Sequence, residues 1–160
     1  MIRAATAEDA GEISAIYNHY VEHTVVTFEE DHITATEMRR RLGASAGRHP
    51  WFVAEVVGTL TGYAYAAPWH PRAAYRHAVE TTVYVDPGHL RRGVGKALYG
   101  ALLDELRRAD FRCAVAVIAL PNAASVALHE KMGFTKAGHL KSIGYKFERW
   151  IDVGHWQLLL

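Results

Sequence analysis

The sequence predicts one mixed α/β domain spanning residues 1–160. Strand-like runs alternate with helical patterns in the middle of the chain, and runs that pair as antiparallel hairpins lie toward its ends. A length of 160 residues suffices for one compact core and is short for two ordinary domains. No repeat, low-complexity tract or Pro/Ser/Gly-rich linker marks a domain boundary.

Two helices are expected after a short opening strand. Thr6 is followed three residues later by Asp9, and Thr34 by Glu37, which is the spacing of a capping box at a helix start. Behind the first cap, apolar residues recur at helical spacing and predict one buried face. These residues are Ile13, Ile16, Tyr17, Tyr20 and Val21. The second helix is expected to run through Met38 and Leu42.

Three strands follow, and the first two are predicted to form an antiparallel hairpin. Residues 51–57 and 63–67 are rich in aromatic and apolar side chains, with a turn expected over 58–62. After a loop bounded by prolines, residues 80–85 form another β-rich run, which ends at an Asp-Pro-Gly turn.

The second half of the chain alternates helices and strands. The expected elements are a helix over 95–109, a strand over 111–118, a short helix over 123–132 and strands over 137–143 and 150–159. Cys113, the single cysteine, lies in an apolar run and is expected to be a buried strand residue rather than a nucleophile. One cysteine cannot form an intrachain disulfide, so the fold does not depend on an oxidising compartment.

The composition excludes several classes of partner. A formal charge of +1 gives no large field to attract nucleic acid or an anionic membrane. The first residues do not have the pattern of a signal peptide, and no segment approaches the ~18 uninterrupted apolar residues of a membrane span. We therefore expect a cytoplasmic protein that binds neither nucleic acid nor membrane.

The most informative segment is a basic, glycine-spaced loop that opens onto a helix. It contains Arg91, Arg92, Gly93, Val94, Gly95 and Lys96. The first N–H groups of a helix have no intrahelical partner, the glycines allow close approach, and the basic side chains add charge. The pattern predicts an anion cradle, and the alternative is a tight turn with a solvated basic face. It matches neither a Walker loop nor the three-glycine dinucleotide fingerprint.

Together with a second segment, this loop resembles the GNAT superfamily of acetyltransferases. The loop is similar to the family's acetyl-CoA signature, and residues 122–134 are similar to its second signature, in the same order. Leu90 departs from the pattern, because the family usually has Gln or Arg there. Further runs resemble the phosphinothricin and methionine sulfoximine N-acetyltransferase subgroup over essentially the whole chain. They are 66–69, 80–85, 115–122, 128–130, 144–146 and 152–157.

The resemblance implies a fold, a co-substrate and a reaction. The fold would be a mixed, mostly antiparallel central sheet flanked by helices, with acetyl-CoA in the splay between the central strands. The reaction would be acetyl transfer to the α-amino group of a small amino-acid analogue such as phosphinothricin, methionine sulfoximine or methionine sulfone. Attack would be direct, in a ternary complex, since no activated Cys or Ser is apparent. The subgroup also implies a homodimer, and no metal is required.

The resemblance also implies roles for individual residues. Glu80 would be the base that takes a proton from the substrate ammonium, with a solvated strand residue or an ion pair to Arg76 as the alternative. His129 would protonate the leaving thiolate or order a proton relay, with a structural helix histidine as the alternative. The backbone of Val83, Tyr84 and Val85 would bind the pantetheine arm and supply an oxyanion-binding N–H. Asn122 would contact the pantetheine, cap a helix, or do both.

Substrate selection is assigned to one loop and to residues near Phe28. The candidates are Phe28, Glu29, Trp69, His70, Pro71, Arg72, Tyr75, Glu80, Thr81 and Thr82. Arg72 would bind the substrate carboxylate, with Arg76 as its competitor. The aromatic residues have ordinary core or dimer packing as their alternative. Tyr145 and Lys146 are further candidates, contributed by this chain or by a partner subunit.

Other readings remain open at this point. His19 and His23 stand one helical turn apart, but no third ligand at a suggestive spacing supports a metal site. The acceptor could be another amine, such as a polyamine, an aminoglycoside or a protein N-terminus. The chain could also bind acetyl-CoA as a sensor without turnover, although the presence of both Glu80 and His129 argues against this.

Overall fold

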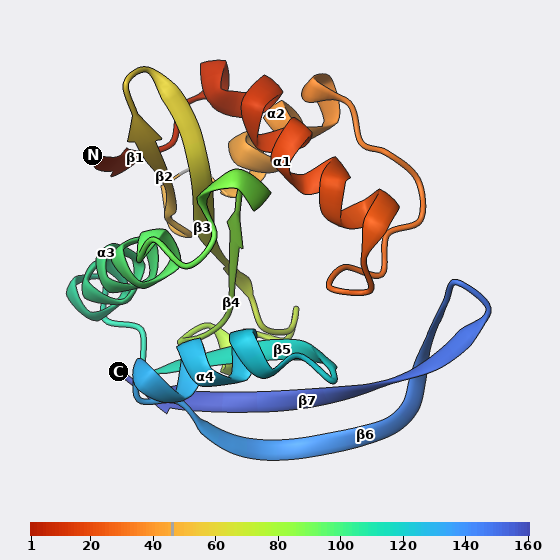
Figure 1. The fold of residues 1–160 in the computed structure, drawn as a ribbon. Coiled ribbons are helices and arrows are strands. Elements are labelled where there is room, and N and C mark those ends of the chain that lie inside the picture. Colours follow the sequence, from red (N-terminus) through yellow and green to blue (C-terminus); the bar gives the residue numbers. More distant parts are fainter. Residues whose placement is uncertain (46) are drawn as a thin grey trace.

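A computed structural model describes residues 1–45 and 47–160, and one sheet runs through the whole of it (Figure 1). Its strands are β1 (Ile2–Ala4), β2 (Trp51–Val56), β3 (Thr59–Pro68), β4 (Ala78–Val85), β5 (Cys113–Leu120), β6 (Thr135–Lys146) and β7 (Arg149–Leu159). Its α-helices are α1 (Ala10–His23), α2 (Ala35–Ser45), α3 (Val94–Arg108) and α4 (Ala123–Lys131). Short 3₁₀ turns cover Ala7–Asp9, Ala73–Tyr75 and Pro87–His89.

The sheet has seven strands in the order β1-β2-β3-β4-β5-β7-β6, and only the β4–β5 pair is parallel. A parallel pair needs a crossover, and α3 provides it. The expected mixed, mostly antiparallel sheet flanked by helices is confirmed. No helix in the described ranges is both long and apolar enough to cross a bilayer.

The two faces of the sheet carry separate cores, because successive strand side chains point to opposite sides. One cluster joins α1 and α2 to β2, β3 and β4 through Val53, Tyr63 and Tyr84. The other joins α3 to the opposite face through Ala54 and Ala64, and it continues to Phe134 and Trp156 near α4 and β7. Side chains on neighbouring strand positions thus hold α1 and α2 on one face and α3 on the other.

Both predicted helix starts are confirmed. The Asp9 carboxylate accepts the Thr6 backbone N–H at 2.7 Å, and the Thr34 hydroxyl accepts the Glu37 N–H at 3.1 Å. The expected turn over 58–62 is wrong, because the chain reverses at Val57 and Gly58 alone and β3 resumes at Thr59. Both turn residues have positive φ, 49° and 76°, which is the conformation that two-residue hairpin turns favour.

Cys113 lies on a strand as predicted but is only half-buried rather than buried. It is the first residue of β5, and at this end of the strand its side chain stays partly open to solvent. Its Sγ accepts a hydrogen bond from Gln157 Nε2 on the adjacent strand β7 at 3.2 Å.

The N-terminal strand is tied to α1 by one buried carboxylate. Asp9 accepts hydrogen bonds from both terminal nitrogens of Arg3, each at 2.8 Å, in addition to the Thr6 N–H. Its side chain is buried while the guanidinium is about one-third exposed. The Arg3 hydrogen bonds hold the pKa of the Asp9 carboxyl below its usual range against the opposing effect of burial.

We expect Asp9→Asn to lower the free energy of unfolding at pH 7 by roughly 1–3 kcal/mol, because the guanidinium and the cap lose a charged acceptor. A lowered folded-state pKa stabilises the fold above the unfolded pKa of about 3.9, and this contribution is lost as the pH falls through the folded value. Urea denaturation should therefore show a difference in the free energy of unfolding between wild type and variant that is smaller at pH 3 than at pH 7. Asp104→Asn, in an exposed i,i+3 pair, is the control and should show no comparable gap.

Candidate active site

The centre of the sheet opens because β4 and β5 stay paired for only a short distance. The strands pair from Ala78 with Cys113 to Glu80 with Val115, and beyond this point they separate, with α3 and α4 beginning at the open end (Figure 1). Two adjoining cavities occupy the opening. They share Val26, Thr82, Tyr84, Val117 and Ala119. The open end of a parallel pair in an α/β sheet is a common place for ligands.

The basic loop has the geometry of an anion cradle. Arg91 and Gly93 have φ of 60° and 81°, and Gly93 is the N-cap of α3 in the left-handed conformation. Glycine adopts this conformation without steric cost. A β-carbon on Gly95 would lie 3.5 Å from the Val85 side chain, so the helix start packs closely on β4. The first N–H groups of α3 therefore open onto solvent beside exposed Arg91, Arg92 and Lys96.

Glu80 lies at the last paired position of β4, half-buried on the wall of the larger cavity. Burial raises the pKa of its carboxyl, and the nearby His70 opposes this effect. No ion pair joins Glu80 to Arg76 within the described ranges, and Arg76 instead donates to the Ala73 carbonyl at 3.2 Å. A carboxylate at a cavity wall with a raised pKa has the properties of a general base.

His129 lies on α4 with its imidazole buried beside the smaller cavity. Its Nδ1 is 2.7 Å from the Ser125 carbonyl oxygen, which can only accept, so Nδ1 carries the proton. Nε2 then accepts from the Tyr99 hydroxyl at 2.8 Å, and Tyr99 lies 3.0 Å from the Thr81 hydroxyl. Burial lowers the pKa of His129, which keeps the ring neutral.

The smaller cavity, of about 50 Å³, is a narrow slot between the diverging strands. Asn122 lines it and also caps α4, since its Oδ1 accepts the Ser125 N–H at 3.1 Å. The two expected roles of Asn122 are thus compatible. Val83 and Tyr84 also line the slot. The Tyr84 ring stacks on Tyr63 and meets Tyr17 edge to face.

The larger cavity, of about 210 Å³, joins the slot to the loop between α1 and α2. It is lined by Tyr17, Val26, Thr27, Phe28, Tyr65, Glu80, Thr82, Tyr84, Val117, Ala119 and Val153. Its volume suits a small molecule of amino-acid size, and its walls combine aromatic and apolar side chains with two threonines and one carboxylate. Of the expected substrate residues, Phe28, Glu80 and Thr82 line this cavity, while Thr81 lines the slot.

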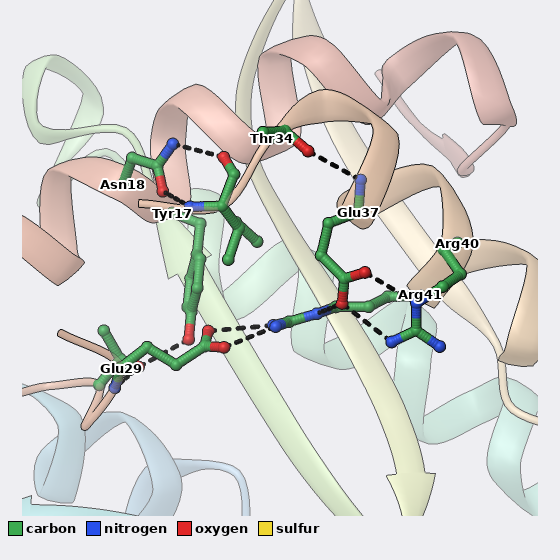
Figure 2. A network of polar contacts seen from close by, with 9 residues as sticks. Tyr17, Asn18, Glu29, Thr34, Glu37, Arg40 and Arg41 are labelled. Carbon is green, nitrogen blue, oxygen red and sulfur yellow. Dashed lines mark hydrogen bonds and ion pairs between the residues drawn. The ribbon is translucent and has the colours of Figure 1, made fainter. Parts of the chain in front are cut away.

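Glu29 does not line either cavity, because its carboxylate is paired with Arg41 of α2 (Figure 2). The same guanidinium bonds Glu37 at 2.9 Å, and Asn18 holds the backbone of Ile33 with two bonds of 2.9 Å. Arg40 and Arg41 lower the pKa of the Glu37 carboxyl to about 2. This network fixes the loop between α1 and α2 over the cavity rather than offering a charge to a ligand.

The loop expected to select the substrate lies outside the two cavities. Trp69 contacts the ring of His155, with centroids 5.9 Å apart, and His70 lies between Trp69 and Tyr75. Pro71 and Arg72 are exposed. Among these residues only His70 influences Glu80, through its charge. The structure therefore leaves a role of Arg72 toward the substrate carboxylate as a prediction.

Four functional candidates in the structure were not predicted from the sequence. Tyr99 and Ser125 complete the His129 chain, and Tyr17 and Tyr65 line the larger cavity. The available signal for Tyr99 was a hydroxyl on the apolar face of α3, where a buried phenol needs a partner. Tyr17 and Tyr65 gave no such signal, because a tyrosine on the apolar face of a helix or strand predicts a core residue.

Other side-chain clusters and cavities among the described residues do not contribute to this site. In the described part of the chain, no group of three His, Cys, Asp or Glu side chains is arranged to hold a metal ion. The rings of His19 and His23 contact each other at a tilt, with centroids 4.9 Å apart. A larger hollow, of about 720 Å³, lies among β1, α2 and β2 and includes neither Glu80 nor His129.

Comparisons with known proteins agree with this geometry. Residues 2–155 match the family model described as an acetyltransferase (GNAT) domain. The chain is 47% identical to phosphinothricin N-acetyltransferase of Streptomyces viridochromogenes, covering 98% of this chain and 85% of the relative. It is 38% identical to L-methionine sulfoximine/L-methionine sulfone acetyltransferase of Salmonella typhimurium, covering 99% and 94%.

A solved structure extends the agreement to three dimensions. The phosphinothricin acetyltransferase of Sinorhizobium meliloti in complex with acetyl-CoA superimposes with a TM-score of 0.97 at 36% identity, covering all of this chain and 88% of that one. The predicted GNAT resemblance and the acetyl-CoA co-substrate are thereby confirmed. With its splayed β4–β5 pair and the cradle at the start of α3, the chain belongs to the GNAT family of acetyltransferases and is an acyl-CoA-dependent N-acetyltransferase.

Proposed function

We propose that this chain, acting as one domain, acetylates the α-amino group of a small amino-acid analogue whose side chain ends in a sulfoximine, sulfone or phosphinate group. One observation carries the proposal. Glu80 combines a raised pKa with a place on the wall of a 210 Å³ cavity that adjoins the cofactor slot. The names of the two relatives, a phosphinothricin and a methionine sulfoximine/sulfone acetyltransferase, favour these acceptors.

The proposed contacts of acetyl-CoA follow the open end of the sheet. The pyrophosphate would meet the first N–H groups of α3, with Arg91, Arg92 and Lys96 supplying charge around it. The pantetheine arm would lie in the slot along the unpaired edge of Val83–Val85, close to Asn122. Leu90 is exposed and replaces a side chain that the family usually uses, but backbone amides would still bind the phosphates.

In the proposed mechanism, Glu80 takes a proton from the substrate ammonium, directly or through water. The amine lone pair then attacks the thioester carbonyl carbon, the C–S bond breaks and the sulfur leaves as a thiolate. The nitrogen loses a second proton as the amide forms, and this proton, passed through water, neutralises the thiolate. A backbone N–H of β4 beyond the last β5 pair would stabilise the developing oxyanion. No covalent intermediate on the enzyme is involved in this direct attack.

His129 is proposed to orient a proton relay rather than to act as a free acid. Both ring nitrogens are engaged, Nδ1 with Ser125 and Nε2 with Tyr99. A neutral ring with no spare N–H cannot donate directly to a thiolate. It can, however, fix the Tyr99 hydroxyl, and through it the Thr81 side chain on the wall of the slot.

Polyamines and aminoglycosides fit the cavity less well. Among the described residues that line it, Glu80 is the one acidic side chain. A polycation would leave most of its charges without an acidic partner in this cavity. A sensor without turnover is disfavoured by a positioned carboxylate with a raised pKa.

We further propose that the enzyme is a cytoplasmic homodimer. The tip of the β6–β7 hairpin presents several large apolar side chains to solvent, and they are Ile143, Tyr145, Phe147 and Trp150. Tyr145 and Trp150 form a cross-strand pair with ring centroids 4.9 Å apart. Contiguous exposed aromatics of this kind favour a protein interface. The single free thiol of Cys113 suits a reducing compartment.

The first test of the proposed function is Glu80→Gln, assayed by thiol release from acetyl-CoA. We expect the wild type to turn over phosphinothricin, methionine sulfoximine and methionine sulfone in preference to a polyamine and an aminoglycoside. The variant should lose roughly a hundred-fold or more in kcat, because the base is gone. Since burial raises the pKa of Glu80, the wild-type rate should fall in acid at a higher pH than an ordinary glutamate would give.

Glu148→Gln, in the exposed β6–β7 turn, is the matched control and should keep wild-type rates. Turnover of other amines alone would contradict the acceptor class. Acetyl-CoA binding without turnover of any amine would favour the sensor.

Nitrogen-detected NMR of the His129 ring tests the relay. We expect a neutral ring protonated at Nδ1 even at pH 6.5, where a free imidazole is about half protonated, because burial lowers its pKa. Tyr99→Phe should shift the Nε2 resonance to that of a ring nitrogen without a hydrogen-bond donor and leave the tautomer unchanged. A ring protonated at Nε2 in the wild type would contradict the relay.

Light scattering tests the dimer. We expect twice the 17.8 kDa mass of the chain for the wild type and a single chain mass for Trp150→Glu, because a buried carboxylate would oppose the interface. Val57→Glu, at the exposed tip of the β2–β3 hairpin, should remain dimeric. A monomeric wild type at micromolar concentration would refute this assembly.

A further inference from the structure

The loop between α1 and α2 forms one wall of both cavities. Val26 lines the slot and the larger cavity, while Thr27 and Phe28 line the larger cavity together with Glu80. A loop with no secondary structure from Val26 to Glu30 needs contacts from elsewhere to keep one position. The position of this wall sets the size of the acceptor cavity.

One of those contacts is a buried lysine far away in the sequence. Lys146 is the last residue of β6, its side chain is 2% exposed, and its Nζ donates to the carbonyls of Val21 at 2.8 Å and Thr27 at 2.9 Å. The two acceptors stand at the end of α1 and in the cavity wall, so one ammonium links both ends of the intervening turn. The ring of Phe147 lies 5.1 Å from the same Nζ.

A glycine two residues earlier on the same strand supports the loop from the same side. A β-carbon on Gly144 would lie 2.3 Å from the Phe28 ring, so the ring rests directly on the strand backbone. Gly144 and Lys146 share one face of β6 because side chains alternate along a strand. In Figure 1 the β6–β7 hairpin curves up toward this loop. From the side of α1, the Tyr17 hydroxyl is hydrogen-bonded to Thr27 Oγ1 at 2.6 Å.

A buried ammonium is costly, and its surroundings indicate what it does. Burial lowers the pKa of Lys146, and the charge of Glu30 opposes this effect. Its described polar contacts are the two carbonyls, with no ion pair to a carboxylate within the described ranges. A methionine would fill the same volume without the desolvation cost. The ammonium adds hydrogen bonds that fix the two carbonyls in direction and distance.

We propose that Lys146 and Gly144 of β6 are positioning residues that hold the Val26–Phe28 wall of the acceptor cavity. This inference rests on the proposed function, since it assigns the larger cavity to the acceptor. Lys146 therefore acts within its own chain, and it was expected instead to complete the pocket directly or from a partner. Specificity for the acceptor then depends on the C-terminal hairpin as well as on the residues that line the cavity.

The test compares Lys146→Met with Lys146→Gln and with Lys141→Met, an exposed lysine on the same strand. For the acceptor that the wild type turns over best, we expect KM to rise roughly ten-fold in Lys146→Met, since hydrogen bonds from a charged group are lost. The KM for acetyl-CoA should change less, within about two-fold, because Val26 is the one residue of this wall that lines the slot and the cradle at α3 lies elsewhere. Lys146→Gln, which keeps two donors, should recover part of the loss, and Lys141→Met should match the wild type.

Gly144→Ala is a second variant with its own control. It should raise the acceptor KM by displacing Phe28, whereas Gly138→Ala on the same strand should not, because its nearest neighbour lies 3.9 Å away. Hydrogen exchange of the backbone amides of residues 21–34 gives a readout that needs no acceptor. Exchange should be faster in Lys146→Met than in the wild type, and unchanged in Lys141→Met.

The outcomes separate this inference from the proposed function. If the wild type turns over an acceptor and the folded Lys146→Met variant has the same KM for it, the positioning role is overturned. Equal rises in the KM for the acceptor and the KM for acetyl-CoA would overturn it too. If the wild type turned over none of the acceptors, the proposed function would fail. Unchanged exchange of residues 21–34 in Lys146→Met would then still overturn the positioning role, and faster exchange would support it.

Discussion

The site depends on the short pairing of β4 with β5. Two parallel strands that stayed paired would satisfy each other's backbone groups and leave no room between them. Here the pairing stops at Glu80 and Val115, so the following β4 residues keep an open edge toward a slot. The last paired residue, Glu80, is the candidate base, and the residues after it line the slot proposed for the thioester. One change in strand spacing thus places the carboxylate and the slot side by side.

The elements around the opening hold it open without occupying it. On one side the buried chain Thr81–Tyr99–His129 joins β4, α3 and α4. On the other, the Tyr20 hydroxyl donates to the Val85 carbonyl and the Tyr17 and Tyr84 rings meet edge to face, so α1 is fixed to the end of β4. Buried polar groups with complete hydrogen bonding give these contacts a single arrangement. Glu80 and the slot can therefore take their positions before any substrate binds.

The sequence predicts what depends on local spacing and misses what depends on distant contacts. Helix caps at Thr6 and Thr34 and the glycine-spaced start of α3 were predictable, because the cause and the effect lie within a few residues. The roles assigned to Glu80 and His129 came from family resemblance. The start of β3 was missed because Val57 adopts a positive φ, which a β-branched residue rarely does. No local signal could place Tyr65 on a cavity wall.

Lys146 shows why a residue whose role depends on distant contacts is not predicted from its sequence neighbours. Beside exposed aromatics on the long hairpin, a lysine predicts solvent or a partner subunit, and only the fold brings it to carbonyls more than a hundred residues away. The acceptor wall is then held by hydrogen bonds and packing from β6, α1 and α2 together, through Lys146, Tyr17 and the Arg41–Glu29 pair. Because several independent contacts hold the wall, a substitution at any one of them can change its position. Changes on the C-terminal hairpin can therefore alter which amine enters while the thioester chemistry at β4 stays the same.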